Sequence, residues 1–162
     1  MDMNYTPKLQ GAYLAPNASI IGDVVLEPDV NVWYGAVIRG DSGPIRVGSG
    51  TNIQDNCVLH EEVTIGKNCT VGHGAIVHGC TIGNGCLIGM GAIILNGAVL
   101  EDGCLVGAGA LVTGKVHAPA GSLVLGSPAK VIRHLTDEEK SASLADAEHY
   151  TQLAQNQLNL QK

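Results

Sequence analysis

The sequence predicts a mainly β protein: a parallel β-helix shaped as a triangular prism of six-residue repeats, with a C-terminal α-helix after it. The first observation is an aliphatic residue that recurs every six positions, whereas strands repeat every two residues and helices every 3.6. This residue occurs at Leu14, Ile20, Leu26, Val32, Ile38, then at Val47, Ile53, Leu59, Ile65, Val71, Val77, and after a five-residue step at Ile82, Ile88, Ile94, Leu100, Val106 and Val112.

The residues around each repeated aliphatic indicate how a short strand turns a corner. Four positions later the side chain is small or β-branched, as at Ala36, Cys57 and Ala75. Glycine often follows the aliphatic directly, as in Ile65-Gly66. An inward aliphatic fills the interior, a small residue fits near the bend, and glycine permits the bend. Three such sides make one coil, and successive coils stack at about 4.8 Å.

Composition is the third observation. The chain has 162 residues, 22 glycines, one tryptophan and no phenylalanine, as a narrow interior filled by aliphatic residues requires. Five cysteines without CxxC spacing argue against a disulfide framework or a thiolate zinc site. Four of them, Cys57, Cys69, Cys86 and Cys104, occupy the small-residue position. We therefore expect them to be small buried hydrophobic residues.

The charge pattern excludes several classes of partner. A net charge of −6 and the lack of a basic run argue against nucleic acid and anionic membranes. No stretch approaches the roughly 18 apolar residues of a membrane span, and the first residues lack the pattern of a secretory signal. The sequence thus favours a cytoplasmic protein.

Three segments are expected along the chain. Residues 1–13 form a lead-in over the first coil, residues 14–128 form the repeat prism, and residues 136–160 form a helix packed along it. Within the prism, Asp41–Arg46 breaks the repeat with glycine and proline, which predicts a loop or short excursion.

The C-terminal helix has a recognisable start and one apolar stripe. Thr136-Asp137-Glu138-Glu139 is typical of a capping box with acidic residues in the first turn. Ala147, Tyr150, Ala154 and Leu158 share one face of the expected helix.

Stacking of the coils brings polar residues into register. Arg39, His60 and His78 each come one position after a repeated aliphatic, and we expect them on the same prism face. His60 and His78 are 18 residues apart, one full coil, so their backbones should lie about 4.8 Å apart. Two imidazoles at that spacing can both reach one metal ion, at about 2.0–2.1 Å per bond.

A third histidine, His73, belongs to the preceding face, in the position that Asp55 occupies one coil earlier. One chain therefore offers two histidines on one face and a single histidine on another. A threefold ring of identical prisms would bring these together, which predicts a homotrimer with up to three shared sites.

Simpler interpretations remain for several of these residues. Arg39 and Asp41 could be an ordinary ion pair that holds an interface, and Gln54 and Asp55 could be turn residues. The other three histidines lack the coil register and are assigned no role; they are His117, His134 and His149.

These residues are where the chain resembles the γ-class carbonic anhydrase family, and the resemblance covers nearly the whole chain. The matching segments are Arg39-Gly40-Asp41, Gln54-Asp55-Asn56, His60, the run GHGAIVHGC at 72–80, IGMG at 88–91 and GSPAK at 126–130. The resemblance implies a left-handed coil and a zinc ion, with Fe²⁺ or Co²⁺ as alternatives, at a trimer interface. The ligands it implies are His60 and His78 of one subunit and His73 of its neighbour.

The implied reaction is the reversible hydration of CO2 to bicarbonate. Three neutral imidazoles leave one coordination position for water, whose pKa the metal lowers to about 7, and the resulting hydroxide attacks CO2. By resemblance, Gln54 orients the reacting oxygen, Arg39 and Asp55 pair across the interface with Asp41 nearby, and Tyr150 overhangs the pocket.

Two positions depart from the archaeal prototype of the family. Acidic residues linked to proton transfer are replaced here by Ser42 and Val63, and Glu61 and Glu62 are shifted from the second position. The sequence therefore favours metal binding over fast turnover.

Two other functions share this architecture. One is a hexapeptide acyltransferase that uses acetyl-CoA and a single catalytic histidine, against which three histidines at ligand spacing and the lack of a long covering loop both count. The other is a non-catalytic trimeric scaffold, whose assembly would survive the loss of all three histidines.

Overall fold

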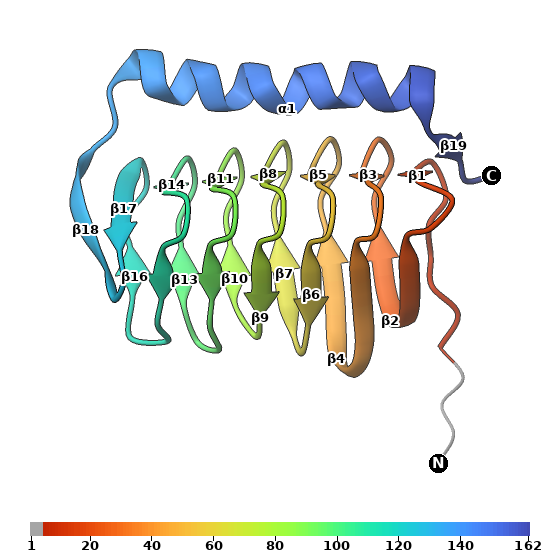
Figure 1. The fold of residues 1–162 in the computed structure, drawn as a ribbon, viewed down its shortest axis with the longest axis horizontal. Coiled ribbons are helices and arrows are strands. Elements are labelled where there is room, and N and C mark those ends of the chain that lie inside the picture. Colours follow the sequence, from red (N-terminus) through yellow and green to blue (C-terminus); the bar gives the residue numbers. More distant parts are fainter. Residues whose placement is uncertain (1–4) are drawn as a thin grey trace.

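The structure, a computed structural model, describes residues 5–162, so residues 1–4 of the expected lead-in lie outside the described part. The predicted β-helix is confirmed: short strands stack in parallel into a three-sided prism, and one long helix lies along it (Figure 1). Within the lead-in, Lys8 pairs with Val25 of the first coil.

Each face of the prism is a stack of strands one coil apart. The first face consists of β1 (Tyr13–Leu14), β3 (Asn31–Val32), β5 (Asn52–Ile53), β8 (Thr70–Val71), β11 (Leu87–Ile88), β14 (Leu105–Val106) and β17 (Ser122–Gly126). The second face consists of the first halves of β2 (Ser19–Leu26) and β4 (Val37–Val47), then β6 (Val58–His60), β9 (Ile76–His78), β12 (Ile93–Ile94) and β15 (Leu111–Val112). The third face consists of the second halves of β2 and β4, then β7 (Val63–Ile65), β10 (Thr81–Ile82), β13 (Val99–Leu100) and β16 (His117–Ala118).

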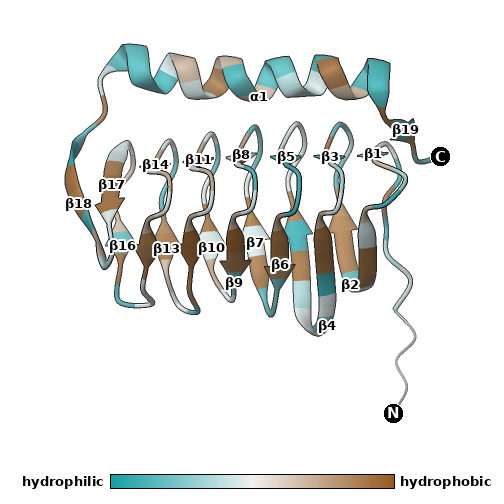
Figure 2. Cartoon of the chain, viewed as in Figure 1, coloured by the Kyte–Doolittle hydropathy of each residue, from teal (hydrophilic) through white to brown (hydrophobic). Residues whose placement is uncertain are grey.

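The repeated aliphatic residues fill the interior, as predicted. Ile38, Ile53, Leu59 and Ile88 have no exposed surface, and each pairs in register with its equivalents on neighbouring coils. Figure 2 shows how hydrophobic residues concentrate in the strands of the prism. Register follows from the repeat because a slip of one residue would turn the aliphatic outward.

The cysteines are small buried residues, in agreement with the sequence. All five are free and buried. In the small-residue position the thiol donates to a carbonyl of the next coil, as from Cys57 to Gly72 at 3.1 Å and from Cys86 to Glu101 at 3.2 Å. Burial raises the pKa of Cys57 to about 11, which keeps its thiol protonated at neutral pH.

The excursion at Asp41–Arg46 lies inside a strand rather than in a separate loop. β4 runs without interruption through these residues, and its pairing with β2 shifts register beside them, from Gly22 opposite Gly40 to Val24 opposite Ile45. The extra residues widen the corner between the second and third faces, so the repeat resumes in phase at Val47.

Helix α1 (Asp137–Gln157) begins at the predicted capping box, in which Thr136 and Glu139 each bond the other's backbone N–H. The helix runs along the first face (Figure 1). Its own residues Ala147 and Ala154 are buried. It is shorter than the expected 136–160, because the backbone at Leu158 is extended and its side chain packs beside Trp33. The described helix lacks the apolar character needed to cross a membrane.

Two antiparallel strands were not predicted. β18 (Ala129–His134) folds back on β17 after the last coil, and β19 (Asn159–Leu160) pairs with β1 after the helix. Each strand covers an edge at one end of the prism, where unpaired backbone groups would otherwise be exposed.

Replacing Thr136 by alanine tests the capping box. The change removes the oxygen that accepts from the Glu139 N–H at 3.2 Å, so we expect a loss of about 1 kcal/mol of unfolding free energy. Thr151→Ala is the matched control, because the Thr151 hydroxyl bonds only a carbonyl within the helix. Thermal unfolding of both variants measures the difference, and equal stabilities would contradict the role of the cap.

Candidate metal centre

Two histidines meet on the second face of the prism. β4, β6 and β9 place Arg39 opposite His60 and His60 opposite His78, the register that the repeat predicts. The Nδ1 atom of His60 lies 3.1 Å from Nε2 of His78. Two nitrogens bound to one tetrahedral zinc at normal bond lengths are about 3.3 Å apart. The two imidazoles are therefore already close to the spacing of a shared ion.

Neighbouring acceptors settle which ring nitrogens carry hydrogen. Nε2 of His60 lies 3.0 Å from the Asp41 carboxylate, and Nδ1 of His78 lies 2.6 Å from the Asn96 carbonyl oxygen. Both acceptors require N–H groups at those positions, so the lone pairs of the neutral rings face each other. Two facing lone pairs need a cation or a proton between them, and the donor set therefore fits a divalent metal.

Asp41 is itself held as an anion. Arg39 donates to it at 2.6 Å, and this hydrogen bond, with a further one from His60, lowers the pKa of the Asp41 carboxyl below its usual range. The ion pair that the sequence left open is thus present within one chain. The Asp41 carboxylate also accepts a hydrogen bond from His60, a candidate metal ligand, and thereby orients its ring.

Glu61 joins the two histidines, which the sequence did not predict. Among the described residues, His60, Glu61 and His78 form the one group of three potential ligands whose donor atoms all lie within 4.8 Å of one another. Glu61 has φ +64°, and this left-handed turn directs its side chain in a way that spacing along a strand does not reveal. Asn96 was missed as well, although it lies one coil beyond His78.

His73 lies at a different corner of the prism, two positions beyond β8, as expected. Its Nδ1 atom is 2.9 Å from the Asp55 carboxylate of the preceding coil, so Nε2 is left for another contact. The predicted third ligand is therefore oriented but stands apart from the other two within one chain. The expected contact between Arg39 and Asp55 of neighbouring copies stays a prediction, and here Asp55 pairs with His73.

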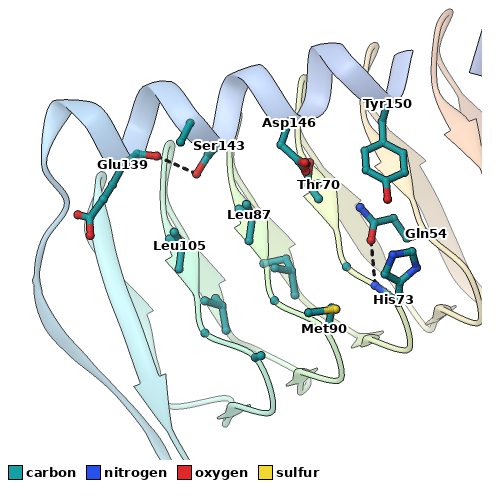
Figure 3. A pocket seen from close by; sticks show the side chains of 17 residues that line it. Gln54, Thr70, His73, Leu87, Met90, Leu105, Glu139, Ser143, Asp146 and Tyr150 are labelled. Carbon is teal, nitrogen blue, oxygen red and sulfur yellow. Dashed lines mark hydrogen bonds between the residues drawn. The ribbon is translucent and has the colours of Figure 1, made fainter. Parts of the chain in front are cut away.

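Gln54 is almost fully buried, with 4% of its surface exposed, and hydrogen bonds fix its orientation. Asp146 of α1 can only accept, so Thr70 donates to it at 3.0 Å and accepts from the Asn52 amide at 2.8 Å. The side-chain carbonyl of Asn52 then accepts from the Gln54 side-chain amide at 3.1 Å. The side-chain carbonyl of Gln54 accepts from the backbone N–H of His73, also at 3.1 Å. The carbonyl oxygen of Gln54 is thus held toward His73 (Figure 3).

A cleft of about 630 Å³ opens between α1 and the first face, beside His73. Its walls are mostly apolar, with Leu87 and Leu105 on the prism side, and Tyr150 stands over Gln54 at one end (Figure 3). Tyr150 packs edge-on against Trp33 at 5.4 Å between ring centroids. Burial raises the pKa of the Tyr150 hydroxyl, so it is neutral at physiological pH.

The prism of six-residue repeats defines the class: this is a hexapeptide-repeat protein of the left-handed β-helix type, with a candidate metal centre on one face. The family model described as the GMPPB C-terminal domain matches residues 41–139. The crystal structure of a hexapeptide transferase family protein from Anaplasma phagocytophilum has a TM-score of 0.89 and 44% identity, and covers 93% of this chain and 92% of that chain.

Relatives with curated names narrow this class to one family. Gamma carbonic anhydrase 1, mitochondrial, of Arabidopsis thaliana is 45% identical over 89% of this chain and 56% of its own length. A probable carbonic anhydrase of Methanocaldococcus jannaschii is 45% identical over 88% of this chain and 92% of its own length. The chain spans about half the length of the Arabidopsis relatives that it matches. It belongs to the γ-class carbonic anhydrase family.

Proposed function

We propose that this protein is a metal-dependent carbonic anhydrase that reversibly hydrates CO2 to bicarbonate. The observation that carries the proposal is the pair of imidazole lone pairs that face each other at 3.1 Å between His60 and His78. In the proposed site His73 of a neighbouring copy supplies the third nitrogen. Zinc is the proposed ion, with Fe²⁺ and Co²⁺ as alternatives that accept the same ligands.

A divalent ion in this site supplies the Lewis acidity that makes water a nucleophile near neutral pH. The chain's own residues prepare the site for it. Asp41 and Asn96 keep the ring hydrogens of His60 and His78 turned away from the ion, and Asp55 does the same for His73. Gln54 presents a carbonyl oxygen with a second lone pair, which suits a hydroxyl group of the substrate or product.

A homotrimer is the proposed assembly, and the surface of the second face supports it. From Val37 onward, one column of its outward side chains is apolar, whereas the matching column of the third face mixes valines with Arg46, Thr64 and His117. The members of the column are half-buried or, for Ile76, 37% exposed: Val37, Val58, Ile76, Ile93 and Leu111. An apolar column beside both halves of the site suits contact with identical copies around a closed ring.

Metal analysis tests the proposal directly. Protein purified without a histidine tag is expected to hold about one divalent ion per chain and to hydrate CO2. Removal of the ion by a chelator should abolish hydration while circular dichroism stays unchanged, because the prism core contains no ligand. Readdition of zinc or iron should restore the activity. A chain that binds no metal after anaerobic reconstitution would exclude the proposal.

An acyltransferase is the second candidate, favoured by the apolar cleft of about 630 Å³ beneath α1. Such an enzyme would use an imidazole as a base without a metal. Binding of acetyl-CoA to the metal-free protein, measured by calorimetry, separates this function from the first.

A further inference from the structure

We propose that Glu61 is a metal ligand, and that His60, Glu61 and His78 form a complete site for a divalent cation within a single chain. The inference shares the two histidines with the proposed function but does not need a neighbouring copy. The third ligand here is the carboxylate of Glu61, which directly follows β6 in the same chain, in place of the imidazole of another subunit.

The backbone at Glu61 is the first observation. Its φ of +64° belongs to a region that residues with a Cβ atom rarely adopt. The other described non-glycine residues in this region are Asp29, Asn56 and Asn68, and short Asp and Asn side chains tolerate it. The longer glutamate side chain does not tolerate this conformation in the same way, so the strained backbone at Glu61 points to a role for its side chain.

Neighbouring coils show what the corner itself requires. The equivalent position carries Gly79 one coil later and Gly22 two coils earlier, with φ of +60° and +82°, and it carries Gly40 on the coil between, where the longer excursion of β4 begins. Glycine adopts these angles without strain. The turn at this corner therefore does not require glutamate, and the strain at Glu61 points to a function of its carboxylate.

The donor set is the second and independent observation. The carboxylate of Glu61 lies within 4.8 Å of ligand nitrogens of His60 and His78, whose lone pairs already converge. Two neutral imidazoles and one carboxylate are a normal set for a zinc site with one open position. The carboxylate also offsets one of the two charges of the ion, which the neutral rings leave uncompensated.

The consequence is an order of events. A single chain can take up the ion before it assembles, with the fourth position filled by water. His73 of a neighbouring copy can then replace the Glu61 carboxylate when the ring closes, which keeps the fourth position open for water. Metal binding and assembly are thereby separable steps, whereas a site that depended on the neighbour's imidazole would fill only after assembly.

Titration of Co²⁺ into the metal-free protein, followed by its visible absorption, tests the site. His73→Ala is expected to bind about one Co²⁺ per chain, and its visible absorption should be that of an ion with few ligands. Addition of Glu61→Gln to this variant should weaken the affinity at least about 10-fold, since loss of a ligand costs no less than loss of its outer contacts. Glu62→Gln in the same background is the matched control, and should leave the affinity unchanged.

Glu61→Gly is the second variant, because it removes the carboxylate and relieves the backbone. We expect a higher melting temperature for the metal-free protein together with weaker Co²⁺ binding. Equal Co²⁺ affinity in His73→Ala with and without Glu61→Gln would overturn the inference, and leave the shared site intact if the unmodified protein binds metal. Cobalt binding that needs Glu61, in a protein without CO2 hydration, would support the inference and remove the proposed function.

Discussion

Mixed oligomers of His73→Ala and His78→Ala chains are expected to recover about one quarter of the unmodified CO2 hydration activity, although each variant alone is nearly inactive. Each variant alone should lose more than about 100-fold, because even outer-shell contacts of metal ligands are worth 10- to 100-fold. The recovery follows from the separation of the two half-sites at different corners of the prism.

The reason lies in the pairing around the ring. A site is intact where a His73→Ala chain supplies His60 and His78 and the next chain, carrying His78→Ala, supplies His73. In random equal mixtures this ordered pair occurs at about one interface in four, whatever the number of subunits in a closed ring.

Co-refolding of the two variants, followed by stopped-flow CO2 hydration, measures the recovery. Simple mixing of the folded variants is the control, and should show no recovery until the subunits exchange. Failure to recover activity after co-refolding, with normal assembly by size-exclusion chromatography, would mean that the site is not shared between copies.

The repeat allowed most of the fold to be predicted, since in a β-helix the register follows from counting. His60 and His78 were placed on adjacent strands because 18 residues make one coil, and the structure pairs them there. The same count put His73 and Asp55 in equivalent positions, and they form a 2.9 Å contact. Periodicity is a global property of the sequence, so it survives local irregularities such as the five-residue step before Ile82.

Features that depend on a single corner or on distant segments could not be predicted in this way. The role proposed for Glu61 rests on its positive φ, and a glutamate in a sequence does not indicate such a backbone conformation. The orientation of Gln54 depends on Asp146, which bonds Thr70 across 76 residues of chain. Side-chain contacts of this kind require the docking of α1 on the first face, and the repeat carries no information about that docking.

Replacement of Leu59 by alanine is expected to cost about 2–5 kcal/mol of unfolding free energy. Leu59 has no exposed surface and fills the interior of the coil directly beneath His60. A prism this narrow has no larger side chain nearby that could move into the space, so the cavity should persist and metal affinity should fall as well. For a chain of this size the loss corresponds to a decrease in melting temperature of roughly 4–20 °C.

Leu144→Ala is the matched control, because Leu144 lies on α1 with 48% of its surface exposed and alanine suits a helix. Its unfolding free energy should change by no more than about 0.5 kcal/mol. Both variants are compared without metal and at one protein concentration, because ligand binding and assembly add to apparent stability. Equal losses in the two variants would mean that the interior of the prism at this coil is not close-packed.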